Sequence, residues 1–337
     1  MNNVRQKKAL LQLFVLLLVL MAVTGFEYWR DSVVAVNAGQ GITVTVKPEM
    51  TAKEIGEVLY QNGVIHNVTL FRIIAKVQGV ENLLQTGDYA LSYQMSTSDI
   101  INKMVRGETA YHLLTIPEGY NVEQIAKLLD EQGLGDGDKF KALARKFVTL
   151  DYMTQQPEII YLVEGYVFPD TYRITRGMTE EDIMKLLITN FDKKLTAEMR
   201  ERAKTLGLSL HQVVTLASVV EKEAKVDQER AVIAGVFFNR LKQGMPLQSC
   251  PTVQYILGYP KVELTIADTQ IVSPYNTYQN PELPPGPIAS PGMAAIQAVL
   301  YPADTPYLYF VAAKDGSHRF SKTYEEHLAA VDAMDRE

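Results

Sequence analysis

The sequence predicts an α+β protein with a single transmembrane helix at its N-terminus. Three observations support this prediction. They are an uncharged apolar run near the N-terminus, a first half that alternates strand-like and capped helical segments, and a second half built around one apolar helix. At 337 residues the chain is more than twice a usual domain of about 150 residues, so we expect two domains.

Residues 9–26 carry no charge and are almost continuously apolar, which approaches the length of about 20 residues that crosses a bilayer. A cleaved signal peptide would have a shorter apolar stretch and a small-residue cleavage site, which we do not find. Three basic residues precede the run, and the positive-inside rule therefore places the N-terminus in the cytoplasm. We expect a cytoplasmic tail (1–8), a transmembrane helix (9–29) in the inner or cytoplasmic membrane, and an extracytoplasmic remainder.

Residues 41–107 are predicted to form a small strand-helix-helix-strand unit. Alternating β-branched residues at 42–46 predict a strand, and 87–91 predicts a returning strand. Thr51 and Asn67 precede apolar helical faces as N-caps, and a further helix closes the unit. This order resembles the LysM module, which binds glycans containing N-acetylglucosamine. Sugar binding and a spacer or partner-docking role both remain open.

Residues 108–149 are predicted to form a second small α/β unit or connector. The segment 46–63 has a partial counterpart in 115–133, where a Pro-Glu dipeptide again precedes a capping box, this time at Asn121. Two copies are too few for a solenoid, which needs about three units. The last predicted domain is then 150–337.

One helix of the last domain is apolar on every side. It is capped by Ser209 and is almost wholly apolar thereafter, so we expect it to be buried. Glu221 follows this stretch directly, and the small residues one turn back, Ala217 and Ser218, would let a ligand approach its carboxylate. Spacing alone leaves two alternatives open: an ordinary glutamate where a buried helix meets solvent, or Glu223 as the acid.

A long segment, 271–292, contains six prolines and is predicted to be irregular. Loops of this length in compact domains are usually functional or disordered, and its tyrosines argue against disorder. The hydroxyl and amide side chains around it suit a neutral, hydroxyl-rich ligand such as a glycan. His318 is either a catalytic base or a structural histidine. We expect a strand at 307–311 and a final helix at 324–334.

Composition and missing motifs exclude several functions. Lys and Arg number 33 against 39 Asp and Glu, a net charge of −6, so the chain lacks the basic excess that nucleic-acid binding requires. One cysteine, Cys250, permits neither an internal disulfide nor a cysteine metal cluster, and the histidines form no HxxH or HxH pair. No GxxxxGK[ST] nucleotide loop and no GxSxG hydrolase elbow occurs. We expect no metal and no cofactor.

Ordered strings throughout the second half resemble the endolytic murein transglycosylases, also called the YceG-like family. The matching strings are 164–172 (EGYVFPDTY), 217–224 (ASVVEKEA), 235–241 (GVFFNRL), 247–249 (LQS), 274–278 (PYNTY), 283–288 (LPPGPI), 290–292 (SPG), 315–318 (DGSH) and 320–321 (FS). Together with the anchor and the LysM-like unit, the resemblance covers essentially the whole chain.

The resemblance implies a membrane-anchored enzyme that cleaves the β-1,4 bond between N-acetylmuramic acid and N-acetylglucosamine in nascent peptidoglycan strands and so ends their elongation. It assigns the catalytic role to Glu221 rather than Glu223. Ordinary glycosidases divide the acid and base work between two carboxylates, whereas the resemblance implies one here. Glu221 would protonate the glycosidic oxygen and then deprotonate the muramic C6 hydroxyl, which closes on C1 to give a 1,6-anhydro end.

The resemblance also suggests sugar contacts and partners. The candidate sugar contacts are Gln248, Ser249, Asn276, Ser290 and Tyr166. Penicillin-binding synthases are expected partners beside the glycan strands themselves. The chain departs from the family at Cys250, where an Asp is usual, and a thiol is only a weak hydrogen-bond donor. Two other functions stay open: a non-catalytic peptidoglycan-binding scaffold for wall synthases, and a hydrolytic muramidase.

Overall fold

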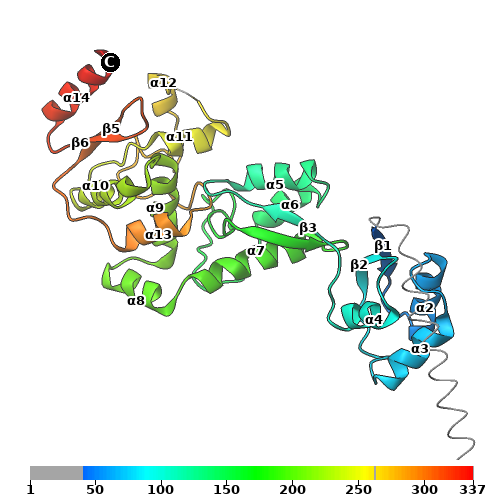
Figure 1. Cartoon of the computed structure of the whole chain (residues 1–337). Helices are drawn as coiled ribbons and strands as arrows, with labels where there is room; N and C mark the ends of the chain where they lie inside the picture. The colour runs from blue at the N-terminus through cyan, green and yellow to red at the C-terminus, as the bar shows by residue number, and fades with distance from the viewer. Residues whose placement is uncertain (1–40, 262, 337) are drawn as a thin grey trace, which may run out of the picture. The chain divides into compact units, whose positions relative to one another are not determined.

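The structure, a computed structural model, describes residues 41–261 and 263–336 (Figure 1). The chain divides into two compact units after residue 112. The predicted cytoplasmic tail, 1–8, and the predicted transmembrane helix, 9–29, lie outside the described residues.

The first unit has the strand-helix-helix-strand order that the sequence predicts. Its elements are β1 (Gly41–Val46), α2 (Ala52–Gln61), α3 (Val68–Val77), β2 (Gly87–Ser92) and α4 (Thr97–Val105). The two strands pair antiparallel, with Val44 opposite Tyr89. Thr51, Asn67 and Ser96 cap the three helices, because each side chain accepts a backbone N–H of the first turn. The apolar faces of these elements pack into a core of their own.

The remaining elements belong to the second unit, apart from the first two residues of β3, at which the division falls. In chain order they are β3 (Tyr111–Thr115), α5 (Val122–Glu131), α6 (Gly137–Ala144), β4 (Thr171–Thr175), α7 (Glu180–Lys194), α8 (Ala197–Thr205), α9 (Leu210–Glu223), η1 (Asp227–Glu229), α10 (Arg230–Lys242), α11 (Cys250–Leu257), α12 (Ile266–Thr269), α13 (Met293–Leu300), β5 (Tyr309–Ala312), β6 (His318–Ser321) and α14 (Tyr324–Arg336). β3 pairs with β4 and β5 pairs with β6. Many helices with small, separate sheets confirm the predicted α+β class.

The central helix of the second unit is α9. All residues from Val213 to Val220 are buried, as the all-round apolar pattern predicts. Both α13 and α10 pack along α9, and α8 and α11 also contact it (Figure 1). Among the described residues no single helix has the length and apolar character of a membrane span. Only α8 and α9 taken together, across a 92° bend, meet that description by length and composition.

Residues 113–149 share one core with the residues that follow them. Leu114, Ile125 and Phe140 belong to the same buried cluster as Phe191. The capping box and apolar spacing of this segment resemble those of the first unit, because both signals are local to one helix. These local signals do not show what an apolar face packs against. In the structure the faces of 113–149 pack against later residues, so the boundary expected near residue 150 does not separate two compact bodies.

The proline-rich segment 271–292 contains no helix or strand, as predicted. Neighbouring side chains hold its backbone in place of secondary structure. Ser218 Oγ accepts the Ile288 N–H at 3.0 Å, and His211 Nε2 donates to the Pro285 carbonyl at 2.7 Å. The segment is therefore an ordered strap fixed on α9.

The last strand pair begins later than the sequence predicts. β5 starts at Tyr309, not Tyr307, because Asn239 of α10 donates its side-chain N–H groups to the Thr305 and Tyr307 carbonyls. Because these two carbonyls bind the Asn239 side chain, the strand pairing of β5 with β6 begins only at Tyr309. The final helix, α14, begins at Tyr324 as expected.

Candidate active site

The Glu221 carboxylate lies in the last turn of α9 and is held from two sides. Its Oε2 accepts the backbone N–H of Gly292 at 3.0 Å, and Gly292 is the N-cap of α13. Arg230 Nη2 lies 3.6 Å from Oε1. These two contacts hold the Glu221 carboxyl group in one position, and its side chain is only 7% exposed.

The turn 118–120 and the segment 290–292 are joined beside Glu221 by backbone hydrogen bonds. The Gly119 N–H donates to the Ser290 carbonyl at 2.8 Å, and the Ser290 N–H donates to the Tyr120 carbonyl at 2.7 Å. Lys222 Nζ donates to the Gly119 carbonyl at 3.1 Å, which ties the turn to α9. Gly119 has φ +75°, a conformation that glycine adopts without strain.

Glu118 is a second carboxylate at this position. A Cβ built on Gly292 would lie 1.9 Å from Glu118 Oε1, so the Glu118 carboxyl occupies the space beside the amide that binds Glu221. Partial burial and then the Glu221 charge raise the pKa of Glu118, while Arg230 opposes that shift. Glu118 is exposed, whereas Glu221 is partly buried.

Two buried polar atoms of this region have no hydrogen-bond partner among the described residues. They are Arg230 Nε and Ser290 Oγ. Buried polar groups are nearly always paired, and exceptions collect at functional sites. Their position next to Glu221 and Gly292 therefore supports a site for ligand chemistry here.

Glu223 points away from Glu221, because residues two apart on a helix lie about 200° apart around its axis. Its Oε1 accepts Ser249 Oγ–H at 2.5 Å, and burial raises the pKa of the Glu223 carboxyl. The neighbouring Cys250 lies with its Sγ 3.0 Å from the Tyr278 hydroxyl, and burial of the thiol raises its pKa although the residue reaches the surface. Glu223 thus binds the start of α11 and is separate from the Glu221 site.

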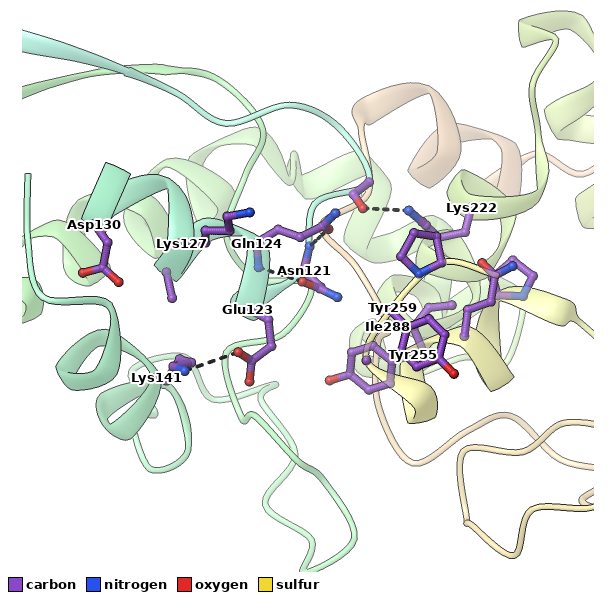
Figure 2. A pocket seen from close by; sticks show the side chains of 16 residues that line it. Asn121, Glu123, Gln124, Lys127, Asp130, Lys141, Lys222, Tyr255, Tyr259 and Ile288 are labelled. Carbon is purple, nitrogen blue, oxygen red and sulfur yellow. Dashed lines mark hydrogen bonds and ion pairs between the residues drawn. The ribbon is translucent and has the colours of Figure 1, made fainter. Parts of the chain in front are cut away.

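A cavity of about 400 Å³ lies beside Lys222, which lines it together with Gly119 (Figure 2). Polar side chains of α5 line one side of it, and Tyr255 and Tyr259 lie opposite, as Figure 2 shows. The wall nearest Glu221 is Gly119 with Lys222, since a Cβ on Gly119 would lie 3.5 Å from Lys222 Cδ and 3.8 Å from Glu221 Cγ. Aromatic rings facing amides and carboxylates are the usual lining of a site for a polar ring-shaped ligand.

Glu164 links α5 to Tyr255, which lie on opposite sides of this cavity. Its carboxyl is fully buried and accepts the Val122 N–H at 3.1 and 3.2 Å, which satisfies the first turn of α5. The Tyr255 hydroxyl donates to it at 3.1 Å. Burial raises the pKa of Glu164 to about 8, although these hydrogen bonds oppose the shift.

We expect Glu164 to make the stability of the protein fall as pH rises from about 5 to about 8. In this window the unfolded chain has lost the proton while the folded protein retains it, so rising pH favours unfolding. Glu164→Gln keeps an acceptor for Val122 and removes the titration. The unfolding free energy of the variant, minus that of the wild type, should grow by a few kcal/mol from pH 5 to pH 8. A constant difference over this range would contradict the assignment.

Comparisons with known proteins identify the family. The YceG-like family model matches residues 44–333. The chain belongs to the YceG-like family. A protein of Bacillus subtilis called endolytic murein transglycosylase is 35% identical over 316 residues, which cover 89% of this chain and 85% of that protein. A Streptococcus pneumoniae protein of the same name is 32% identical over 334 residues, covering 90% of this chain and 60% of that protein.

A solved structure of a YceG-like protein from Listeria monocytogenes has a similar fold. It aligns with a TM-score of 0.60 at 35% identity and covers 87% of this chain and 100% of that one. The similarity therefore extends over both compact units of this YceG-like chain.

Two of the candidate sugar contacts lie inside the YceG-like fold. Tyr166 is 1% exposed, and its hydroxyl lies 2.7 Å from His211 Nδ1. Asn276 is fully buried and donates to the Thr269 and Ile271 carbonyls. No ligand reaches either side chain without rearrangement, so the structure does not support direct sugar contact for them. Tyr166 contacts His211, which binds the Pro285 carbonyl, and Asn276 binds carbonyls at the start of the strap. Both side chains thus help to position the proline-rich strap.

The other three candidates lie nearer the surface or the site. Gln248 is exposed, has φ 52°, and accepts Arg240 Nη1 at 3.2 Å. Ser249 is committed to Glu223, and Ser290 adjoins the Glu221 site through its backbone. Gln248 and Ser290 therefore stay predictions as sugar contacts, whereas Ser249 already serves the fold.

The structure also bears on the small residues beside Glu221 and on His318. The space left by Ala217 and Ser218 is filled by the strap, because Ser218 accepts the Ile288 N–H, so a ligand does not approach Glu221 from that side. His318 lies 2.7 Å from Glu229 Oε2 through its Nδ1, and its side chain is 3% exposed. This supports the structural alternative for His318.

The sequence reasoning missed Glu118, Arg230 and the role of Gly292. The Pro-Glu repeat marked the segment of Glu118 but not its neighbour in space. Arg230 carried no motif at all. Gly292 was part of a matching string, but that its amide binds Glu221 follows only from the folded chain.

Proposed function

We propose that this chain is an endolytic murein transglycosylase. The observation that carries the proposal is the Glu221 carboxylate, fixed at the end of a buried helix between the Gly292 amide and Arg230 and adjoining a cavity with tyrosine and amide walls. The names of the Bacillus and Streptococcus relatives support it. The substrate is the glycan strand of peptidoglycan, cut at the β-1,4 bond between N-acetylmuramic acid and N-acetylglucosamine.

In this proposal Glu221 is the general acid. Its proton passes to the glycosidic oxygen as the bond to C1 of the muramic residue breaks. The C6 hydroxyl of the same sugar attacks C1 and closes a 1,6-anhydro ring while its proton passes to the Glu221 carboxylate, so Glu221 is reprotonated and no water is consumed. The attacking group belongs to the substrate, and its proximity replaces a positioned water. No cofactor takes part in these steps.

The cavity beside Lys222 is the proposed binding site for the adjoining sugars. Tyr255 and Tyr259 offer faces for pyranose rings, and Asn121 and Gln124 offer amides for hydroxyl and acetamido groups. The aromatic contacts come from tyrosine, because the only tryptophan of the chain is Trp29, in the predicted anchor.

We further propose that the helix 9–29 anchors the protein in the cytoplasmic membrane and leaves both compact units outside. There the enzyme would cut nascent strands and end their elongation. The LysM-like unit 41–107 would bind glycan or dock penicillin-binding synthases. The apolar run, the basic tail and the order of elements in the first unit support these proposals.

Mass spectrometry of the products tests the function. The purified protein should release fragments with 1,6-anhydromuramic ends from peptidoglycan strands. Reducing muramic ends would instead establish a muramidase. No cleavage at all, with binding to strands retained, would favour a scaffold for wall synthases.

A further inference from the structure

We infer that Arg230 is a positioning residue of the reaction, which acts through Glu221 and stabilises the carboxylate that forms there when the proton leaves. The inference rests on the proposed function and deepens it. It keeps Glu221 as the one group that exchanges protons with the sugar, and it gives the buried guanidinium beside that group a task of its own.

The position of Arg230 is built into the fold. It is the first residue of α10, and the backbone is fixed on both sides of it. The residue before it, Glu229, accepts the His318 N–H at 3.0 Å, and the carbonyl of the residue after it, Ala231, accepts the Ala303 N–H at 2.9 Å. The short connection from α9 to α10 then lets the Arg230 side chain reach back to the last turn of α9.

The two oxygens of the Glu221 carboxyl group have different partners. Oε2 accepts the Gly292 N–H at 3.0 Å. Oε1 lies 3.6 Å from Arg230 Nη2, which is within ion-pair distance but longer than an ordinary hydrogen bond. No hydrogen bond to Oε1 comes from residues 41–261 or 263–336. Oε1 is therefore the oxygen that is free to hold a proton, and it does so with a positive charge beside it.

Arg230 keeps its charge although its side chain is only 10% exposed. Burial opposes the charge of the guanidinium, but the hydrogen bond to Asp227 and the negative charges of Glu221, Asp227 and Glu118 outweigh it and raise the pKa of Arg230. The Asp227 side chain is 82% exposed, whereas that of Glu221 is 7% exposed. Because charges interact most strongly where water is excluded, Arg230 acts mainly on Glu221.

Stability alone does not account for an arginine at this position. A buried ion pair contributes little to folding, since the loss of hydration offsets the attraction between the charges. Arg230 Nε is also buried and has no hydrogen-bond partner in the part of the chain that the structure describes, which costs about 1–3 kcal/mol. An apolar side chain of similar length would avoid both costs. The guanidinium therefore points to a task in the reaction.

That task follows from the charge of Glu221 during the proposed reaction. Glu221 is neutral until the glycosidic oxygen takes its proton, and negative until the C6 hydroxyl returns one. The negative charge has to form on a side chain that is almost wholly buried. Arg230 attracts the negative form and interacts little with the neutral one. It therefore lowers the barrier to bond cleavage and does not tighten the binding of the strand.

Arg230→Ala is the main test, measured as the release of anhydro ends from uncrosslinked glycan strands by the full-length protein. We expect a kcat about 100-fold lower, with a KM within about threefold of the wild-type value. Arg230→Lys retains a positive charge near Glu221 and should have a kcat at least about tenfold above that of Arg230→Ala. Guanidinium chloride at a low, non-denaturing concentration should also raise the rate of Arg230→Ala, whereas sodium chloride of equal ionic strength should not.

Asp227→Asn is the matched control, because it changes the other partner of Arg230 and keeps an oxygen that can accept the hydrogen bond. We expect its kcat, its KM and its thermal unfolding midpoint to stay close to those of the wild type. A loss of kcat in Asp227→Asn equal to that in Arg230→Ala would overturn the inference, because the effect would then belong to the connection between α9 and α10.

Three results for Arg230→Ala would also overturn it. The first is an unchanged kcat. The second is a higher KM with an unchanged kcat, which would make Arg230 a contact of the strand itself. The third is a loss of kcat that neither guanidinium nor the lysine variant reduces, which would show a structural role. Failure of the proposed function is distinct, because the wild-type protein itself would then release no anhydro ends.

Discussion

Glu221→Gln should lower the rate of glycan cleavage at least about 1,000-fold. The glutamine side chain has the same shape and can still accept the Gly292 N–H, so the end of α9 and the N-terminus of α13 should keep their contact. It has no proton to give to the glycosidic oxygen. The loss would therefore come from chemistry and not from folding. Product release from labelled strands and the thermal unfolding midpoint measure the two effects separately.

Glu223→Gln is the matched control, because Glu223 lies in the same turn of α9, two residues after Glu221. Its amide oxygen can still accept Ser249 Oγ–H, and burial already favours an uncharged group there. We expect cleavage within a few-fold of the wild type. Equal loss in both variants would contradict the assignment of Glu221, and full activity of Glu221→Gln would remove the acid from the proposed mechanism.

The sequence predicts the helices well because their signals are local. Thr51, Asn67, Asn121 and Ser209 each cap the helix that was expected after them, three of them in full capping boxes. The side-chain oxygen that ends a loop and the apolar spacing that follows both lie within one or two turns. No long-range contact is needed to interpret them.

The arrangement of the site cannot be predicted in the same way. Glu118, Glu221 and Gly292 lie far apart in the chain. Backbone hydrogen bonds of Gly119 and Tyr120 to Ser290 bring the first and the last together, and the Gly292 N–H donates to the Glu221 carboxylate. The small residues Ala217 and Ser218 show the same limit. Their size correctly indicates a close approach, but the group that approaches is the strap of the chain itself.

The strap also makes Gly165 a position where one methyl group should have a large effect. Gly165 has φ +80°, and a Cβ there would lie 2.4 Å from Pro287 Cβ and 3.0 Å from Val214 Cγ1. Pro287 lies between Pro285 and Ile288, which are bound to α9. Gly165→Ala should therefore push the strap off α9. We expect a loss of about 3 kcal/mol in the free energy of unfolding, from backbone strain and overpacking together.

Gly177→Ala separates these two contributions. Gly177 has φ +91°, but a Cβ on it would have no atom within 4 Å. Only the strain of the left-handed conformation remains, about 1 kcal/mol. The strap ends at Gly292, whose amide binds Glu221. Gly165→Ala should therefore also lower the cleavage rate of the protein that remains folded, whereas Gly177→Ala should leave that rate unchanged. Equal unfolding free energies for the two variants, measured by denaturant titration, would show that the strap yields to the methyl group and does not depend on the Gly165 contact for its position over Glu221.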